Sequence, residues 1–312
     1  KGRLEFPAIQ ATDTQNRELR GRLSADLNLL TAYENRLTSQ GDIAIENASL
    51  SLGENRTLSG NIKAMNASVV KGDRSIRLQG NFDIQKMAAS FGPQTFLKGD
   101  ILTEKTDLTW SLDDQGKHAF DVHSGLTITG AQGSIKGAQT LAGTARIPVF
   151  ALHHTAEKST LETSGQLETA EIRFSPAQSF QGSPSFNISA SFDPQKNDPF
   201  DYQGAISFTN GLFTGVPYID QASNMRGTIT FTPGHLKTQQ LTFQAMETSV
   251  QLSGLLTDFS SPRVSINASS ENVNIGKLMS LFPALGAKLK ADINGQAAVN
   301  FKYHGSLQSP DK

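Results

Sequence analysis

The strongest constraint on this chain is a short pattern that recurs along its length: an apolar residue, any residue, glycine, any residue and a second apolar residue. From Gly21 onward, the first glycines of this kind lie roughly 20 residues apart, a period typical of repeat proteins. Apolar and polar residues alternate around each glycine, which predicts a β-strand with one apolar and one solvated face. The sequence therefore predicts one unit, a pair of strands, used repeatedly. Copies of the pattern occupy 19–23, 58–62, 78–82, 97–101, 202–206, 225–229, 252–256, 293–297 and 303–307.

Turn-forming residues divide this pattern into short strands. We expect Glu46-Asn47 to form a turn between strands at 41–45 and 48–52, and Asp113–Gly116 to connect two further strands. Divided in this way, the chain holds roughly 24 strands stacked at about 4.8 Å each. Glycine inside a strand marks a bend or a bulge, so the recurrent glycine is expected to bend each strand at the same height. Further expected turns lie at 209–211, 232–235 and 260–262.

A sheet with one apolar face must bury that face against another surface. The sequence offers few helices as cover: 276–285 predicts a short helix before Pro283, and 85–90 predicts one helical turn. Two interpretations stay open, a series of β-sandwiches or one long sheet that curls around its own apolar face. Regular repetition with few covering elements favours an all-β fold, an elongated, curled, mostly antiparallel sheet that forms a taco-like groove with one or two short helices.

Composition narrows the functional classes. Apolar residues make up 37% of the chain and charged residues 18%, and neutral polar residues fill the balance, as a solvated sheet face requires. The formal charge of -1 provides no basic face, so no nucleic-acid partner is predicted. The lack of cysteine excludes disulfides, thiolate metal sites and cysteine nucleophiles. No apolar run is long enough to span a bilayer.

An apolar trough open to water is costly, so it should hold an apolar ligand. Phospholipid acyl chains fit this requirement because they need length and apolar contact rather than specific hydrogen bonds. Exposing about 30 chain carbons to water would cost roughly 24 kcal/mol, and a continuous trough replaces that barrier with shallow steps. We also expect a cap on the sheet from Leu278, Leu281 and Phe282. The candidate lining residues, for which ordinary sheet core is the alternative interpretation, are Ile206, Phe208, Phe213, Ile229, Phe231, Leu241, Phe243, Val250, Leu252, Val264 and Ile266.

Three segments in the last third of the chain carry a family resemblance. They read GAISFTNGLF at 204–213, SNMRGTITFT at 223–232 and TSVQLSGLLTDFSSP at 248–262. Together they resemble the C-terminal region of AsmA-like proteins, relatives of TamB and YhdP. The resemblance implies a repeating β-groove protein of the Gram-negative envelope. Such a parent protein is anchored in the inner membrane, crosses the periplasm and carries phospholipids toward the outer membrane, with components of both membranes as partners.

The same resemblance and a break at 193–199 suggest how the chain is organised. We expect a β-repeat segment of the groove at 1–200 and an AsmA-like repeat ending in a short helix at 201–283. Residues 284–312 are expected to begin a further β-unit. Because the chain starts at Lys1 and stops within the pattern, it is expected to be an excised segment.

Catalytic and metal sites are not predicted. His153 and His154 are neighbours on a strand and point to opposite faces, which makes them a poor chelating pair, so two solvated histidines are favoured. His118 and His123 lie near Asp121, and an aspartate-rich hairpin explains them better than acid–base chemistry. The family resemblance carries no catalytic motif. We therefore predict no enzymatic activity, no metal and no cofactor.

Two functions compete on these grounds. The favoured one is a non-enzymatic periplasmic conduit for phospholipid that supports outer-membrane biogenesis. The alternative is a structural or adhesive β-array, a sandwich or solenoid that binds protein or polysaccharide partners. The two differ in one respect, namely whether the apolar face is left open or is filled by the chain itself.

Overall fold

The computed structural model describes residues 1–12, 17–51, 55–113, 116–137, 139–216, 219–281 and 295–306. Its contacts divide the chain into two compact units. The sequence-predicted boundary at residue 200 lies beside the junction at 201–202, whereas the assignment of 173–186 to the second unit was not predicted. Unit 1 comprises Lys1–Ile172 and Asn187–Asp201, and unit 2 comprises Arg173–Phe186 and Tyr202–Lys312.

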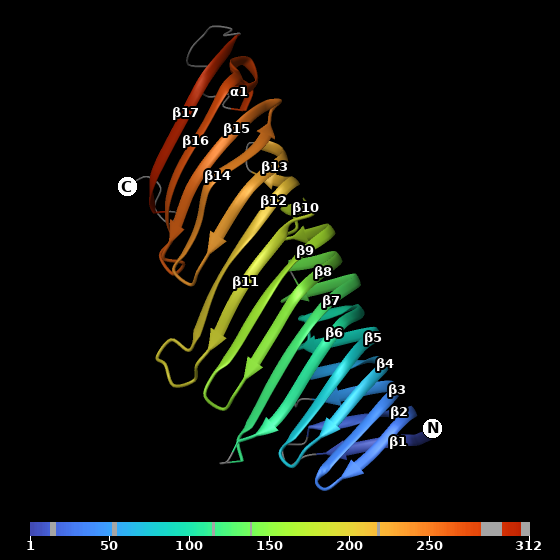
Figure 1. Ribbon diagram of the computed structural model, residues 1–312. Coiled ribbons are helices and arrows are strands. Elements are labelled where there is room, and N and C mark those ends of the chain that lie inside the picture. Colours follow the sequence, from blue (N-terminus) through green and yellow to red (C-terminus); the bar gives the residue numbers. More distant parts are fainter. Residues whose placement is uncertain are drawn as a thin grey trace. The chain divides into compact units, whose positions relative to one another are not determined.

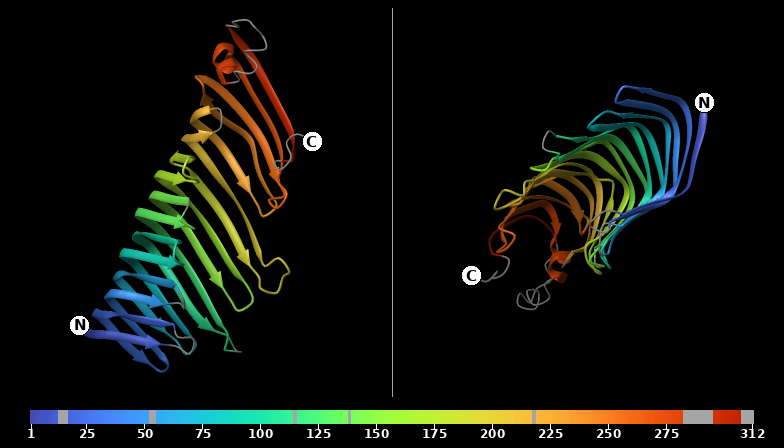
Figure 2. Two further views of the ribbon diagram at one scale, coloured as in Figure 1. Left: turned by 180° about the vertical axis from the view of Figure 1, so that it is seen from behind. Right: turned by 90° about the horizontal axis from the view of Figure 1, so that it is seen from below.

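Strands make up nearly all of both units (Figure 1). By hydrogen bonding, the 17 described strands belong to one sheet, and the sheet curls within unit 1 (Figure 2). The expected all-β fold class is therefore confirmed, and the alternative of stacked sandwiches is wrong. Unit 1 contains β1 (Gly2–Thr12), β2 (Glu18–Tyr33), β3 (Arg36–Ser51), β4 (Arg56–Lys71), β5 (Ser75–Phe91), β6 (Phe96–Leu112), β7 (His118–Ile135), β8 (Gln139–His154), β9 (Ser159–Arg173) and most of β11 (Ser185–Phe192). Unit 2 contains β10 (Ser179–Gly182), most of β12 (Phe200–Val216), β13 (Ile219–Phe231), β14 (His235–Ala245), β15 (Thr248–Thr257), β16 (Arg263–Asn274), α1 (Ile275–Leu281) and β17 (Gln296–Ser306).

The strands are longer and fewer than the sequence predicted. β3 runs through Glu46-Asn47, and β12 runs through 209–211, where turns were expected. β5 runs through 85–90, where a helical turn was expected. These predictions are wrong because a bulge and a turn use the same residue types, so local sequence does not distinguish a bulge within a strand from the end of a strand. The structure has 17 described strands where the sequence suggested roughly 24.

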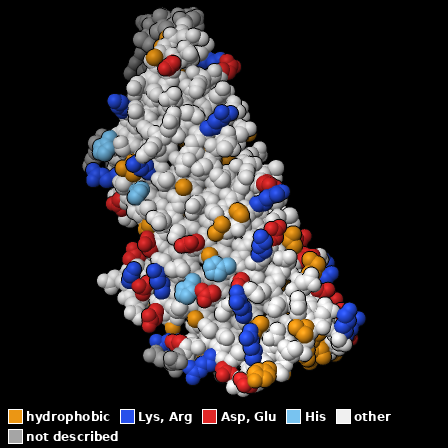
Figure 3. Space-filling model, in the orientation of Figure 1, with side chains coloured by type: hydrophobic (Ala, Val, Ile, Leu, Met, Phe, Trp, Pro, Cys, Tyr) orange, Lys and Arg blue, Asp and Glu red, His pale blue; other side chains and the backbone are white. Residues whose placement is uncertain are grey.

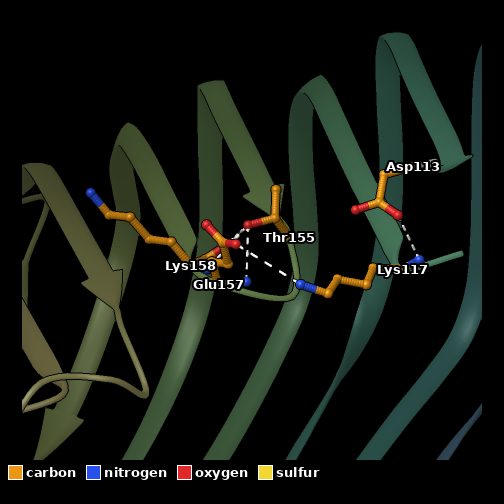
Figure 4. Close-up of polar contacts among 5 residues, drawn as sticks. All are labelled: Asp113, Lys117, Thr155, Glu157 and Lys158. Atoms are coloured by element: carbon orange, nitrogen blue, oxygen red, sulfur yellow. Dashed lines mark hydrogen bonds and ion pairs between the residues drawn. The ribbon is translucent and has the colours of Figure 1, made fainter. Parts of the chain in front are cut away.

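Other turns lie where they were predicted. The Gly116 N–H donates to the Asp113 carbonyl at 3.0 Å between β6 and β7, and the Thr232 N–H donates to the His235 carbonyl at 2.9 Å between β13 and β14. Figure 4 shows the β6–β7 turn and the neighbouring β8–β9 turn of unit 1. In the β6–β7 turn, the Lys117 N–H donates to Asp113 Oδ1 at 2.8 Å. Lys117 Nζ also lies 4.0 Å from Glu157 Oε1, and this exposed ion pair joins the β6–β7 turn to the β8–β9 turn.

Thr155 organises the second of these turns. Its Oγ1 donates to the Lys158 carbonyl at 3.1 Å and accepts from the Lys158 N–H, also at 3.1 Å (Figure 4). The same oxygen accepts from the Glu157 N–H at 3.3 Å. The Thr155 N–H also donates to the Lys158 carbonyl at 2.8 Å, so the hydroxyl reinforces a turn that a backbone hydrogen bond already closes.

Two rows of bulges cross the sheet of unit 1. In each row, a bulged residue with positive φ on one strand lies beside a glycine on the next strand. We call the row through Asn66 (φ 51°) and Lys105 (φ 53°) crease A, and the row through Asn47 (φ 51°) and Lys86 (φ 54°) crease B. Register shifts accompany all four residues. Because bulges bend a strand and increase its twist, these rows are where the sheet turns.

The recurrent glycines make room for the neighbouring bulge rather than bending their own strand. A Cβ atom on Gly60 would lie 3.2 Å from the Gln85 carbonyl oxygen, beside the bulge of crease B. At Gly41 the same atom would lie only 2.1 Å from the Asp26 carbonyl oxygen, where the β2–β3 register also shifts. The glycines therefore lie beside bulges, but each bulge is on the adjacent strand, which the sequence did not predict.

Each bulge also keeps the apolar residues on one face of the sheet. In β3, Ile43 and Ile45 share a face with Ala48 and Leu50, so the spacing becomes three residues across Asn47. Without the extra residue, strict alternation would send the second half of the strand's apolar set to the opposite face. The bulge thus allows one long strand to present a continuous apolar face.

No described element covers that face in unit 1. The described contacts between its elements join strands that are neighbours in the sheet. Figure 2 shows the strands of unit 1, coloured blue to green, bending so that the sheet curls. Among the described residues, no large side chain is fully buried, and most of the buried apolar residues are alanines. On the face seen in Figure 3, charged side chains are scattered among neutral ones, and hydrophobic side chains form only small groups.

Candidate functional site: an apolar trough

The curled sheet of unit 1 forms a trough with a floor and two walls. The floor is the strip between the creases, and it presents Ile45, Ile62, Ile84 and Ile101 to the interior. Wall A is the part of the sheet on the other side of crease A from the floor, and it includes Leu78 and Leu108. Wall B is the part on the other side of crease B, and it includes Leu50, Leu58 and Leu97. An apolar hollow lies at each of the two corners where floor and wall meet.

Hollow B lies at crease B and has a volume of about 410 Å³. Wall B contributes Leu50, Leu58 and Leu97, and the floor contributes Ile62 and Ile84. Leu58 is 43% exposed, so this wall is open rather than packed against another part of the described chain. The lining is almost entirely aliphatic, which suits an apolar ligand that needs no directional contact.

Hollow A lies at crease A and has a volume of about 320 Å³. It is lined by Ile43, Phe82, Leu78 and Leu108, and it shares Ile62 and Ile84 with hollow B. The two hollows are therefore adjacent corners of one trough. The floor residues between them are half-buried, with one side against the sheet and the other facing the interior.

A small hydroxyl cluster lies at the edge of hollow A. The Thr106 hydroxyl donates to Thr103 Oγ1 at 2.7 Å and lies 2.8 Å from Ser124 Oγ. Thr103 Oγ1 also accepts from the Phe82 N–H at 2.9 Å, and that N–H is freed by the register shift at crease A. The three buried hydroxyls are thus satisfied by one another and by the backbone, and they complete the bulge.

In unit 2, the residues predicted to line a groove lie on one face of the sheet. Ile206 is opposite Ile229, Leu241 is opposite Leu252, and Phe243 is opposite Val250. Residues that face each other across an antiparallel pair share a face. The remaining predicted residues join this face through the partners Phe208 with Gly227, Phe231 with Leu236, Val264 with Leu256, and Ile266 with Gly254.

Phe213 joins the same face beyond the bulge of β12. It lies opposite Phe180, which is buried, and its ring stacks on Phe174 with centroids 5.8 Å apart. Phe180 in turn meets the edge of Phe208 at 5.3 Å and covers Gly211. Phe174 and Phe180 were missed from sequence because no alternating run surrounds them.

The predicted lining residues of unit 2 differ in exposure. Leu241 and Val264 are buried, and the other nine are half-buried. Their assignment to a groove stays a prediction. The predicted cap falls on α1, whose backbone begins at Ile275, but the side chains of Leu278 and Leu281 and the whole of Phe282 lie outside the described residues.

Sequence reasoning missed the lining residues of unit 1. Leu58, Leu78 and Leu97 each open a copy of the apolar–x–Gly–x–apolar pattern, and Ile62, Phe82 and Ile101 close those copies. The signal was therefore present in the sequence. The alternation is clearest in unit 2, whereas in unit 1 the bulges divide it into shorter runs.

The solvated face of unit 1 carries ion pairs. Arg77 Nε donates to Asp107 Oδ1 at 2.9 Å, and Gln79 Nε2 donates to Asp107 Oδ2 at 3.0 Å. The hydrogen bond from Arg77 is the main reason that the pKa of Asp107 lies below its usual range, and the bond from Gln79 lowers that pKa further. The partner of His153 is Asp121, and His154 Nδ1 lies 2.7 Å from Ser159 Oγ. Within the described ranges, no group of three or more His, Cys, Asp or Glu residues is arranged to hold a metal.

Comparison with protein-family models, with curated proteins and with solved structures found no match to this chain. No described helix has the length and apolar character needed to cross a membrane.

Proposed function

We propose that the chain is part of a lipid conduit, in which the trough holds the acyl chains of phospholipid. The observation that carries the proposal is the pair of open corners, hollow A and hollow B, lined by aliphatic side chains and not covered by any described element of unit 1. Leaving such a surface in water is unfavourable. Burying an acyl chain against it would stabilise the complex by about 0.8 kcal/mol per buried methylene.

The trough supports acyl-chain binding, and the sequence resemblance extends the proposal to a biological setting. The likeness to AsmA-like proteins supports the further proposal that the parent protein is anchored in the inner membrane and lies in the periplasm of a Gram-negative envelope. There it would pass phospholipid toward the outer membrane without catalysis. Many similar aliphatic contacts, each shallow, would allow a chain to move along the trough without a reacting residue.

Photocrosslinking tests the proposal directly. A photoreactive amino acid at Leu97 on wall B should crosslink to vesicles that contain labelled phosphatidylethanolamine. Ile62→Asp or Ile84→Asp should abolish the crosslink because a charge on the shared floor makes acyl-chain burial unfavourable. Lys63→Asp, on the solvated face of the same strand, is the matched control and should leave the crosslink intact.

The outcomes separate the two competing functions. Crosslinking that is lost only in the floor variants supports the conduit. Equal crosslinking in Ile62→Asp and the unmodified protein, with both proteins folded by circular dichroism, would overturn the proposal. Native mass spectrometry of the purified chain adds a second test, since the conduit should retain phospholipid and a structural array should be free of it.

A further inference from the structure

A repeated side-chain contact holds each bulge of β3–β6 from the solvated face. The four contacts share one form: a backbone N–H of a positive-φ residue donates to Oδ1 of an Asx residue on the adjacent strand. The Asx residue always follows a recurrent glycine. The contacts are Asn66 N–H to Asp42 at 2.9 Å, Asn47 N–H to Asn61 at 2.8 Å, Lys105 N–H to Asn81 at 2.9 Å, and Lys86 N–H to Asp100 at 2.7 Å.

The contacts are reciprocal within each hairpin. β3 supplies Asp42 to the bulge of β4, and β4 supplies Asn61 to the bulge of β3. The β5–β6 hairpin repeats both contacts 39 residues later in the chain, with Asn81 in the place of Asp42 and Asp100 in the place of Asn61. The repeating unit of this region is therefore a hairpin with two of these N–H to Asx contacts, one at each crease.

Each Gly-Asx pair acts on both of its neighbours. Asn61 holds the bulge of β3, and the preceding Gly60 leaves room for the bulge of β5. Asp100 holds the bulge of β5, and Gly99 leaves room for the bulge of β7 beside Thr129. Without an acceptor on the neighbouring strand, the bulged N–H would have no strand partner, and an extended, flatter pairing would compete with the bulge.

These N–H to Asx contacts lie on the solvated face of the sheet, directly behind the hollows on its apolar face. Asn47, held by Asn61, separates floor residue Ile45, which lines hollow A, from Ala48 and Leu50 on wall B, which line hollow B. The angle at crease B therefore decides how closely wall and floor approach across hollow B. At crease A, Lys105, held by Asn81, separates Thr103 from Thr106 and Leu108, and these three residues line hollow A.

We propose that Asp42, Asn61, Asn81 and Asp100 are positioning residues that set the opening of the trough. They touch no ligand, since they lie on the solvated face. They act through the bulges, which fix the wall-to-floor angle and so the width of hollows A and B. For its ligand readout this proposal rests on the proposed function, whereas its geometric readout does not.

A distance measurement across the trough tests the proposal. The chain has no cysteine, so spin labels can be placed at Thr57→Cys and Val70→Cys, at exposed or half-exposed sites on the two walls of β4. Asn61→Ala should lengthen or broaden the distance distribution because it frees crease B. Asn61→Asp should restore the original distribution because a carboxylate oxygen also accepts the hydrogen bond.

A control separates this effect from general loss of a polar side chain. Asp83 lies on the same solvated face and accepts from Gln85 Nε2 at 2.9 Å, without holding a bulge. Asp83→Ala should leave the distribution unchanged. If Asn61→Ala fails to fold, Asp100→Ala tests the same contact in the next hairpin, with labels at Lys98→Cys and Thr109→Cys and with Asp100→Asn as the rescue.

A fluorescent fatty acid, dansyl-undecanoic acid, provides the ligand readout. Asn61→Ala should weaken its binding several-fold, and Asn61→Asp should bind like the unmodified chain. An unchanged distance distribution in both alanine variants would overturn the positioning role. A shifted distribution in a protein that binds no probe in any form would leave the positioning role standing and would contradict the proposed function.

Discussion

At the scale of single residues, the fold depends on a few positions with unusual backbone conformation. The positive-φ residues of β3 and β4 are asparagines, which tolerate the left-handed region well. The equivalent residues of β5 and β6 are Lys86 and Lys105, which tolerate it poorly. The β3–β4 and β5–β6 hairpins therefore form the same bulges, but the backbone strain at positive φ is greater in β5–β6.

This difference yields a stability prediction. Lys86→Asn should stabilise the chain by about 0.5–1 kcal/mol, because asparagine adopts positive φ with less strain than lysine. The measurement is the urea midpoint of unfolding. Lys63→Asn, at an extended position on the solvated face, is the control and should be neutral or slightly destabilising. A midpoint that does not rise would show that Lys86 is not strained.

Close approach of strands makes a second prediction at this scale. Gly41→Ala should destabilise the chain by about 1–3 kcal/mol or more, because its Cβ would overlap the Asp26 carbonyl oxygen at 2.1 Å. Gly125→Ala is the matched control, since its Cβ would have ordinary contacts, the nearest at 3.6 Å. Equal thermal midpoints for the two variants would contradict the role assigned to Gly41.

At the scale of elements, strand pairs are joined by polar contacts on the solvated face. The Arg77–Asp107 pair links β5 to β6 and lowers the pKa of Asp107 in the folded state. A lowered folded pKa means that the carboxylate stabilises the fold above its unfolded pKa. That contribution is lost as the pH falls through the folded pKa.

The stability difference between the unmodified chain and Asp107→Asn should therefore depend on pH. It should be present at pH 6 and should shrink as the pH falls from about 4 toward 2. Urea unfolding at several pH values measures it. Asp83→Asn, whose partner among the described residues is the side-chain amide of Gln85, serves as the control. A difference that stays constant over this range would show that the pair does not act through ionisation.

The single described helix has its own local contacts. The Lys277 N–H donates to Asn274 Oδ1 at 3.1 Å, the contact expected of an N-cap. Lys277 Nζ also lies 2.6 Å from Glu247 Oε2 and lowers the pKa of that carboxyl, which ties α1 to the β14–β15 turn.

Removing the cap should loosen the helix. Asn274→Ala should cost about 1 kcal/mol of local stability, and Asn274→Asp should cost little because it keeps the acceptor. Hydrogen exchange of the α1 amides is the measurement, since the loss should be confined to the helix and its contact with β16. Uniform exchange changes across unit 2 would contradict a purely local cap.

At the scale of the whole molecule, unit 1 is an array in which each strand contacts its sheet neighbours. Stability in such an array is a sum of local terms and nearest-neighbour terms. Hydrogen exchange of Gly41→Ala should therefore rise most in β2–β4 and should change little in β7–β8 of the same unit. A uniform rise across unit 1 would indicate a single cooperative core, which the open trough does not provide.

Several features could be predicted from sequence because they depend on local chemistry. Period-two alternation around Gly60 and Gly99 predicts strands with one apolar face, and scarce helices predict that this face stays uncovered. The turns at 113–116 and 232–235 follow from their residue types. The shared face of the predicted residues in unit 2 follows from alternation as well, except for Phe213, which the bulge of β12 separates from Phe208.

The position of the trough was decided only by tertiary structure. Asn47 and Asn66 have the composition of turn residues, and nothing local distinguishes a turn from a bulge. The difference arises because Asn61 and Asp42, on adjacent strands, accept the freed N–H groups and hold the strand continuous. A contact between residues 14 or 24 positions apart cannot be seen in a window of local sequence, so the corners and the hollows they enclose appear only when the strands are paired.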